Sequence, residues 1–315
     1  MRPLALFFAG VAIAGSLVME SSAVPAAAQA NDDRNDLRVM VVGLAARNYQ
    51  ESMDFYTKVM GFKVGFSFSL DGKRMNTYFQ LSHDSFIEMS EAPANATPGF
   101  THIHLQTGDR DAVVARLQKT GVMVSDIRIS MPTMEKSATI TDPSGIRFEP
   151  TELTTGSMTK RAMDAWNDSG FSPRVLVAGI AVKNYPASQN FYGKMMGFPV
   201  AFSFASADGQ RITTYYQVSK ESFLEMQSAT EATPAGITHL HIQVPNVAAA
   251  VARLRQLGVA APERGATTPN TATDPGVTQP SNVKSANVYD PQGLRLKLNE
   301  LIPESLTTKA INAWK

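Results

Sequence analysis

The chain contains no cysteine among its 315 residues, which excludes disulfides, thiolate metal sites and a cysteine nucleophile. Any bound metal ion must therefore be held by histidine, aspartate or glutamate. A large excess of one charge is also lacking, because 29 Lys and Arg face 28 Asp and Glu and leave a formal net charge of +1. This balance gives no electrostatic reason to expect nucleic acid or a polybasic membrane contact. We therefore expect the partner to be a small molecule.

Long apolar runs are missing except near the N-terminus. Arg2 is followed by an almost wholly apolar stretch from Leu4 to Met19, and the small residues Ala28 and Ala30 precede a very polar segment. This order is typical of a secretory signal peptide, and the apolar stretch is shorter than a membrane-spanning helix needs. We predict a cleaved signal peptide over residues 1–30 and a mature protein that is periplasmic or secreted and does not contact a membrane.

The rest of the sequence is an internal repeat of two copies. Residues 38–68 align without a gap with residues 174–204, and about half of the positions are identical. The match continues through THIHLQ and THLHIQ to a D-P-x-G turn, which starts at Asp142 in the first copy and Asp290 in the second. We predict domains over residues 31–168 and 169–315. A Pro/Thr/Asn/Gly-rich insert in the second copy, around Thr267 to Asn282, is predicted to be a surface loop.

Strand and helix patterns alternate within each copy. Val39 to Ala45 is rich in β-forming residues, and the helical spacing that follows it stops at Gly61. Short strands come next, two of them joined through Asp71-Gly72, a strong hairpin signal. The same plan starts again with the strand His102 to Thr107. Each copy is therefore predicted to hold two βαβββ units, so the fold is α+β with four such units.

Four of the five histidines lie on two matched strands. Alternate side chains of a strand share a face, so His102, His104 and Gln106 point one way while their apolar neighbours point the other. His239 and His241 repeat the pattern in the second copy. The polar face could be the solvent-exposed side of a sheet. Because two neighbouring histidines are unusual there, we predict that they face a polar cavity.

Glutamates accompany these histidines. Glu88 and Glu225 occupy matched positions in SFIEM and SFLEM. Glu149 follows the first D-P-x-G turn, but its counterpart in the second copy is Lys297. An ammonium in place of a carboxylate makes the second copy a poor metal site. The sequence therefore predicts one functional site and one decayed site.

These features resemble the vicinal oxygen chelate superfamily, which includes glyoxalase I, fosfomycin-resistance transferases, extradiol dioxygenases and metal-free bleomycin-binding proteins. The resemblance rests on the four βαβββ units, the D-P-x-G turns and the stretch N-Y-x-x-S-x-x-F-Y-x-x-x-M-G-F that begins at Asn48 and Asn184. It covers nearly all of residues 37–153 and 173–301. It implies two tandem glyoxalase-like domains arranged as an internal pseudo-dimer.

The resemblance also implies a ligand set. Metal-using members take a histidine or glutamine from the first strand, and that position here is Val41 or Val177, neither of which can coordinate. The remaining positions imply a metal site of His102, Glu149 and Glu88, with Glu225 in place of Glu88 if the units swap between copies. The metal would be Zn, Ni, Mn or Fe, with no organic cofactor. The missing first ligand leaves metal binding open.

Two functions follow from this set. The first is a glyoxalase-like lyase or isomerase acting on a small oxygenated compound, aromatic compounds included, with Glu149, His104 and Glu88 as catalytic residues. We expect Tyr78, Gln106, Tyr215 and His241 to contact the substrate. The second is a metal-free protein that binds a small molecule without turnover, as bleomycin-binding relatives do. The sequence leaves open whether the chain forms a homodimer.

Overall fold

The computed structural model describes residues 37–69, 72, 75–167, 173–206, 209, 211–262 and 268–315. The predicted signal peptide and the predicted boundary between the domains at residues 168–169 lie outside these residues, so both stay predictions. Within the described residues, no helix is long and apolar enough to cross a membrane.

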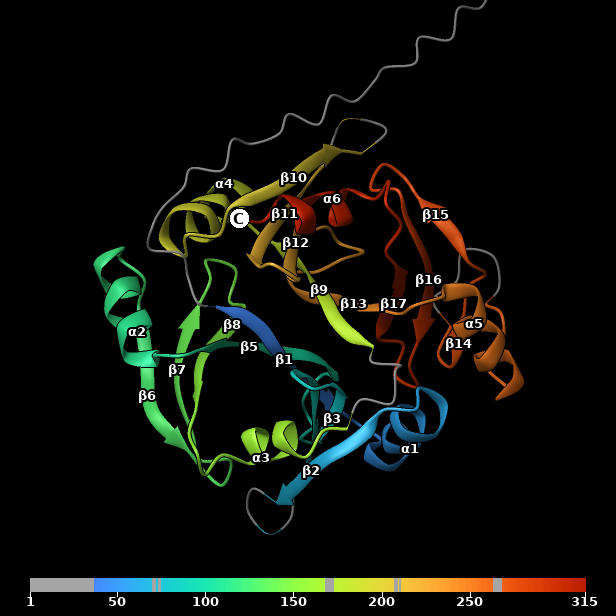
Figure 1. Cartoon of the computed structure of the whole chain (residues 1–315), viewed down its shortest axis with the longest axis horizontal. Coiled ribbons are helices and arrows are strands. Elements are labelled where there is room, and N and C mark those ends of the chain that lie inside the picture. The colour runs from blue at the N-terminus through green and yellow to red at the C-terminus, as the bar shows by residue number, and fades with distance from the viewer. Residues whose placement is uncertain are drawn as a thin grey trace, which may run out of the picture.

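Two large sheets, one from each copy, dominate the molecule (Figure 1). Sheet A runs in the order β2-β3-β4-β1-β5-β8-β7-β6 and sheet B in the order β10-β11-β12-β9-β13-β17-β16-β14. The strands of sheet A are β1 Arg38–Ala46, β2 Lys63–Ser69, β3 Met75–Ser82, β4 Ser85–Glu91, β5 Gly99–Thr107, β6 Val124–Ser130, β7 Glu135–Thr141 and β8 Arg147–Leu153. Those of sheet B are β9 Arg174–Val182, β10 Val200–Ala205, β11 Ile212–Ser219, β12 Ser222–Ser228, β13 Gly236–Gln243, β14 Thr271–Ala272, β15 Gly276–Thr278, β16 Val283–Tyr289 and β17 Arg295–Glu300. The predicted α+β fold of four βαβββ units is confirmed.

The two units of a copy pair with each other. In sheet A, β1 lies between β4, to which it is parallel, and β5, to which it is antiparallel. β9 takes the same place between β12 and β13 in sheet B. Each copy therefore completes its own sheet, and the alternative in which units swap between copies is excluded.

Helices flank each sheet on the side away from the histidines. They are α1 Tyr49–Asp54, α2 Arg110–Lys119, α4 Tyr185–Gln189 and α5 Val247–Gln256, and α1 and α4 continue as the π-helical segments η1 Phe55–Val59 and η2 Asn190–Met195. Asn48 caps α1 by accepting from the backbone N–H of Glu51, and Asp109 caps α2 in the same way through Ala112. The predicted stop at Gly61 is present, with a φ of 78° that favours glycine.

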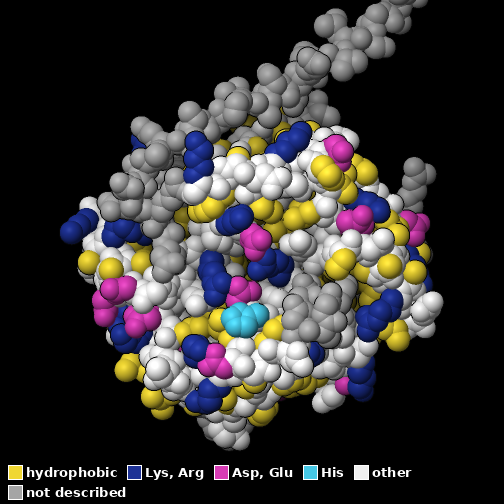
Figure 2. All heavy atoms as spheres, viewed as in Figure 1, with side chains coloured by type: hydrophobic (Ala, Val, Ile, Leu, Met, Phe, Trp, Pro, Cys, Tyr) yellow, Lys and Arg dark blue, Asp and Glu magenta, His cyan; other side chains and the backbone are white. Residues whose placement is uncertain are grey.

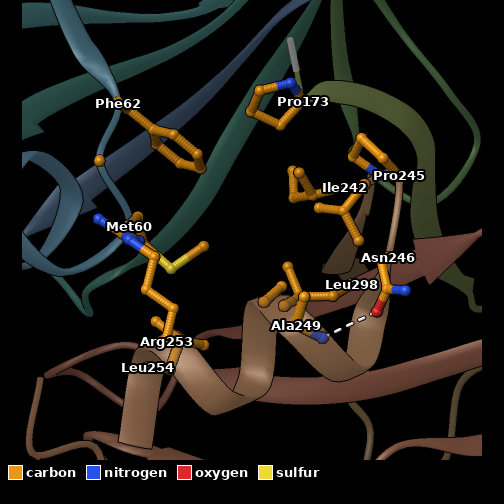
Figure 3. Close-up of a pocket in the computed structure, with 13 residues that line it drawn as sticks. Met60, Phe62, Pro173, Ile242, Pro245, Asn246, Ala249, Arg253, Leu254 and Leu298 are labelled. Carbon is orange, nitrogen blue, oxygen red and sulfur yellow. Dashed lines mark hydrogen bonds between the residues drawn. The ribbon is translucent and has the colours of Figure 1, made fainter. Parts of the chain in front are cut away.

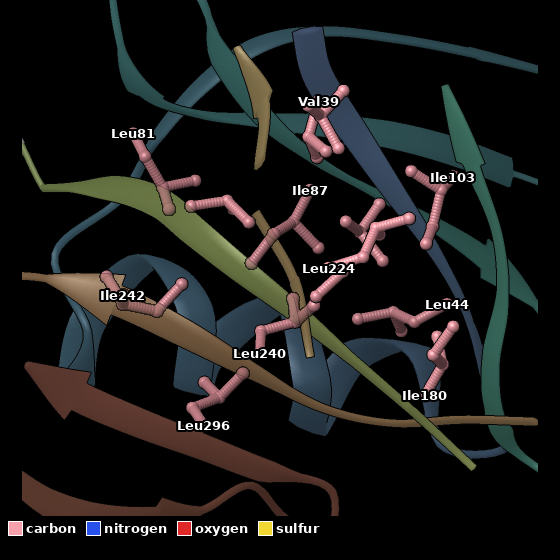
Figure 4. Close-up of a cluster of buried hydrophobic side chains, with 14 of the residues drawn as sticks. Val39, Leu44, Leu81, Ile87, Ile103, Ile180, Leu224, Leu240, Ile242 and Leu296 are labelled. Atoms are coloured by element: carbon pink, nitrogen blue, oxygen red, sulfur yellow. The ribbon is translucent and has the colours of Figure 1, made fainter. Parts of the chain in front are cut away.

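The apolar faces of both sheets share one central core (Figure 4). Strand alternation turns Ile103 and Leu105 of β5 toward this core, and Leu240 and Ile242 of β13 do the same from the second copy. All four are fully buried, and each such side chain contributes about 2 kcal/mol to the free energy of unfolding. The two copies are therefore held together as one packed body.

Two reciprocal hydrogen bonds join the copies at their D-P-x-G turns. Tyr56 of η1 donates to Oδ2 of Asp290 at 3.0 Å, and Tyr192 of η2 donates to Oδ2 of Asp142 at 2.8 Å. The other oxygen of Asp142 accepts from the backbone N–H groups of Ser144 and Ile146, which fixes the turn. Each turn is thus held by a helix of the other copy.

The terminal helices cover the concave faces of the sheets. α3 Met158–Asp164 lies between the two edges of sheet A, near β2 and β6, and α6 Leu306–Ala313 lies between β10 and β15 of sheet B (Figure 1). Met163 of α3 packs against Tyr78 and Phe86. Leu306 and Ile311 of α6 pack on the matching cluster in sheet B. We call the concave face of each sheet, together with the terminal helix that covers it, the cup of that copy.

The described part of the second copy's insert, from residue 268 on, lies largely at the surface as predicted, but it is not all loop. It forms β14, whose two residues are buried, and β15, and both strands pair with β16. They take the sheet edge that β6 occupies in the first copy. The unpaired backbone groups at the edge of β16 explain why a polar insert becomes ordered there.

Candidate metal centre

The site lies on the concave face of sheet A, where three neighbouring strands meet. Gly43 of β1 is registered opposite Glu88 of β4 on one side and His102 of β5 on the other. A Cβ atom at residue 43 would lie 2.2 Å from Cε1 of His102. A larger residue here would push aside the His102 ring, which occupies the space over the β1 backbone.

Glu88, His102 and His104 form a compact buried group, and one ligand atom from each lies within 4.8 Å of those of the other two. Nε2 of His102 is 3.1 Å from Oε2 of Glu88 and 2.9 Å from Nε2 of His104. Nε2 of His104 is 3.6 Å from the same glutamate oxygen. The histidine row thus faces inward, as the strand pattern predicts.

Neighbouring polar groups orient these side chains. Thr101 Oγ1 lies 2.8 Å from Nδ1 of His102. Tyr78 donates to Oε2 of Glu88 at 2.9 Å, and Asn76 donates to Oε1 at 2.8 Å. Such partners fix ring and carboxylate orientation, as the second shell of a metal site does.

The donor set fits a divalent cation. Thr101 Oγ1, and Thr151 Oγ1 at 3.4 Å from Nδ1 of His104, can accept the two Nδ1 protons. Both Nε2 lone pairs then converge with the Glu88 carboxylate on one point, which is unfavourable without a cation or a proton between them. Two imidazoles and one carboxylate suit Zn or Fe, and the set of oxygen and nitrogen donors does not select between them.

The electrostatics of the group agree with this arrangement. Burial alone would raise the pKa of Glu88, but His102, His104 and the Tyr78 hydroxyl lower it to about 2. Burial lowers the pKa of His104 to about 4, against the opposing effect of Glu149. The group therefore presents a carboxylate and a neutral imidazole at neutral pH, which are the forms that bind metal.

Glu149 lies next to this group without belonging to it. Its Oε2 is 3.9 Å from Nε2 of His104, while Arg147 and Arg128 approach its carboxylate at 3.4 and 3.7 Å. Burial would raise the pKa of Glu149, but His104, His102 and the two arginines lower it. The carboxylate is thus ionised and available beside the three-residue group.

A third acid, Glu135, was not anticipated from the sequence. It is 1% exposed, and Thr159 of α3 donates to its Oε1. Burial raises its pKa to about 7, with further contributions from the charges of Glu88 and Glu149. The alternation of β7, which also turns Ser137 to the concave face, is the signal that could have placed Glu135 in the cup.

The second copy repeats the three-residue group. Glu225, His239 and His241 lie within the same mutual distance, and Tyr215 donates to Glu225 as Tyr78 does to Glu88. Nε2 of His241 is 3.2 Å from Oε2 of Glu225. A Cβ at Gly179 would lie 2.1 Å from Cε1 of His239.

The surroundings of the second group differ in charge. Lys297 occupies the position of Glu149, and Val283 that of Glu135. Asn299 replaces Thr151, and its Nδ2 lies 2.9 Å from Nδ1 of His241. The second cup has therefore lost two acids and gained a base.

All four residues expected to contact substrate have side-chain partners in the structure. Tyr78 and Tyr215 are 2% and 4% exposed and serve Glu88 and Glu225. Gln106 is not brought into the group, because its Oε1 accepts two hydrogen bonds from Arg38. Arg38 in turn pairs with Asp84 at the junction of the copies. His241 belongs to the second three-residue group.

Charged side chains gather near the middle of one face of the molecule (Figure 2). At the junction of the copies, Arg174 pairs with both Asp84 and Glu221, and these residues line a cavity of about 190 Å³. Both acids that line it are already paired, Asp84 with Arg38 and Arg174, and Glu221 with Arg174, while Lys220 also lines the cavity.

A second cavity, of about 450 Å³, lies between the copies (Figure 3). Met60 and Phe62 line it from the first copy, and Ala249, Leu254 and Leu298 from the second. None of the histidines or glutamates of the two groups lines it. It is an apolar gap in the packing between copies and is separate from both cups.

Comparison with known proteins identifies the fold. The model of the Glyoxalase/Bleomycin resistance protein/Dioxygenase superfamily matches residues 38–149 and 174–298. The chain belongs to this superfamily. The two matched regions are the two copies, so each copy is one glyoxalase-like domain, and the predicted resemblance is confirmed.

Solved structures of the superfamily share this architecture. The 2,3-dioxygenase LapB from Pseudomonas sp. KL28 is 17% identical with a TM-score of 0.65, and the match covers 85% of this chain and 93% of that one. The halotolerant catechol dioxygenase BphC is 17% identical with a TM-score of 0.61, over 84% and 87% of the two chains. The Mn(II)-bound glyoxalase from Novosphingobium aromaticivorans is 17% identical with a TM-score of 0.62, over 84% and 83%.

At this level of identity the similarity shows a common fold and leaves the reaction undetermined. Among curated proteins, none matches the chain. The function must therefore be argued from the two cups themselves.

Proposed function

We propose that this protein is a metal-dependent lyase or isomerase that acts on a small oxygenated compound in the cup of the first copy. The observation that carries the proposal is that Glu149 lies beside the Glu88–His102–His104 group, 3.9 Å from His104, without being one of its three members. The first cup thus holds a metal-ligand set together with a separate carboxylate.

Each residue has a distinct role in this proposal. Glu88, His102 and His104 would hold a divalent ion, which when bound supplies Lewis-acid polarisation of two neighbouring substrate oxygens. Glu149, whose pKa is lowered by His104, His102 and the two arginines, accepts a proton from the adjacent carbon and returns it. Tyr78 and Asn76 keep the Glu88 carboxylate in place. α3 and its partner Glu135 close the cup and exclude water.

A second candidate is ring-opening oxidation of a catechol. Two histidines and one carboxylate are the ligand type of non-haem iron oxygenases, and two structures similar to this chain are described as catechol dioxygenases. Glu149 favours the first candidate, because proton transfer at carbon needs a base beyond the metal ligands.

The test measures metal content and chemistry together. The purified protein should contain one divalent ion that is lost in the His102→Ala variant. With dihydroxyacetone in D₂O, we expect exchange of carbon-bound protons, detected by NMR. The Glu149→Gln variant should lose this exchange by about 10²-fold or more while keeping its metal.

Other outcomes separate the alternatives. Oxygen consumption with catechol that does not depend on Glu149 would identify the dioxygenase. Tight ligand binding by metal-free protein, with neither exchange nor oxygen consumption, would leave the bleomycin-binding type of function instead.

We further propose that this activity takes place outside the cytoplasm, on the basis of the leader-like residues 1–30. N-terminal sequencing of protein isolated from its own cell should begin near Asn31. A start at Met1 would contradict export by signal cleavage.

A further inference from the structure

The second cup carries an unbalanced positive charge. Residues of β17 alternate between faces, and Leu296 and Leu298 enter the central core. Arg295 and Lys297 therefore point to the concave face, as Asn299 does through its contact with His241. In the register of β13 and β17, Arg295 is opposite His239 and Lys297 is opposite His241. Two cations thus stand beside the imidazole pair.

The first copy shows what a cation in this position pairs with. Arg147, the counterpart of Arg295, lies 3.4 Å from the carboxylate of Glu149. In the second copy the Glu149 position is Lys297, so Arg295 faces a like charge two residues along its own strand. Within the described part of the chain, neither Arg295 nor Lys297 forms an ion pair with an acidic side chain.

Glu225 does not relieve this imbalance. Its carboxylate accepts from Tyr215 and lies 3.5 and 3.2 Å from Nε2 of His239 and His241. Two cations against one carboxylate leave one positive charge without compensation. Burial of such a charge costs free energy unless an anion accompanies it. Burial accordingly lowers the pKa of Lys297, although Glu225 acts in the opposite sense.

We propose that the cup of the second copy is a binding site for a small organic carboxylate, held between Arg295 and Lys297. The ligand carboxylate takes the position that the Glu149 carboxylate occupies in the first copy. Arg295 offers paired N–H donors and Lys297 a point charge, the usual partners of a carboxylate. The second site thus changes its ligand from a cation to an anion, while it keeps the contacts of Gly179, Tyr215 and Thr238.

The experiment titrates benzoate into the full-length protein by isothermal calorimetry, with the neutral benzamide as the uncharged comparison and inorganic phosphate as a second anion. We expect one benzoate per chain, binding at least tenfold more tightly than benzamide. Lys297→Met should weaken benzoate binding at least tenfold, and Lys297→Glu should abolish it by restoring the pairing of the first copy. The exposed Lys183→Met serves as the matched control and should bind as the parent does.

Circular dichroism spectra and melting curves of each variant show whether it is folded. Benzoate binding that is unchanged in both Lys297 variants, or equal binding of benzamide and benzoate, would overturn the proposal. So would failure of the folded parent to bind benzoate. Tighter binding of phosphate than of benzoate would reject a carboxylate as the ligand. The proposed metal chemistry of the first copy does not depend on any of these results.

Discussion

The two copies carry the same Glu-His-His group on two matched strands, yet they surround it with opposite charge. In the first copy, Glu149 and Glu135 add acids to the cup. In the second, Lys297 and Val283 take those positions. The scaffold therefore fixes where the imidazoles stand, while two or three residues on β7, β8 and their counterparts decide what the cup can bind.

This comparison separates two kinds of contact. Three contacts that position the group are kept in both copies, namely the glycine under the ring, the tyrosine on the glutamate and the threonine beside the first histidine, whereas Asn76 and Thr151 are Thr213 and Asn299 in the second copy. Those that set the charge differ. Substitutions in the first copy should therefore lower activity, and those in the second copy should not. Substitutions of the contacts that both copies keep should lower stability in either copy.

The sharpest contrast is expected between His102→Ala and His239→Ala. Removing a metal ligand costs more than removing an outer partner, whose loss costs about 10- to 100-fold. We expect His102→Ala to lower turnover at least about 100-fold and to remove the metal. His239→Ala should leave turnover within about twofold. Metal analysis and the exchange assay measure both, and equal losses would show that the copies act together.

Glu135 should make stability depend on pH in one copy alone. Its pKa is raised to about 7 in the folded chain, so the folded state holds this proton more tightly than the unfolded state. Its contribution to the unfolding free energy is fully present below about pH 4.5 and falls until about pH 7, by up to about 3 kcal/mol. Glu135→Gln should remove this decline in urea unfolding measured at several pH values.

The matched position provides the control. Val283→Glu would place an acid in the second cup, where Lys297 replaces the carboxylate of Glu149 and a positive charge favours ionisation. It should therefore not produce the decline between pH 4.5 and 7. A decline as steep as that of the first copy would mean that burial alone, and not the acids around Glu135, sets the effect.

A smaller and equal effect is expected from Tyr78→Phe and Tyr215→Phe. Each removes a hydrogen bond to a buried carboxylate, worth about 2 kcal/mol. Unfolding measurements should show similar losses for the two variants. Only Tyr78→Phe should also lower turnover. If Tyr215→Phe lowered turnover to the same degree, the division between the copies would be wrong.

The smallest effect concerns the glycines beneath the rings. Gly43→Ala pushes the His102 ring aside and should weaken metal binding about tenfold. Gly179→Ala crowds His239 equally but should leave metal binding in the first copy unchanged. Metal titration of both variants checks this pair, and unaltered affinity in Gly43→Ala would show that the ring can move without cost.

Much of the fold could be predicted because its signals are local. Strand alternation around His102 and His104 predicts which face they share, and the D-P-x-G turns mark the strand that follows. The partnership of Glu88 with His102 could not be derived in this way. It depends on the register of β4 and β5 across Gly43, which no local pattern encodes.

Two features of the site were not predicted from the sequence, for related physical reasons. Glu135 stands at the first residue of β7, where alternation is hard to recognise, and its partner Thr159 is on a later helix. Gln106 shares the strand face of the histidines, but Arg38 from the neighbouring strand takes its amide oxygen. Both outcomes depend on contacts between segments far apart in the sequence, which composition and periodicity do not report.

The crossed bonds from Tyr56 to Asp290 and from Tyr192 to Asp142 tie each half of the chain to a turn of the other. If either half were made alone, its D-P-x-G turn would lose the tyrosine that holds it. Each half would also expose a large apolar surface to water. A chain cleaved between the two copies should therefore reassemble from its two fragments. One fragment alone should form a homodimer or precipitate.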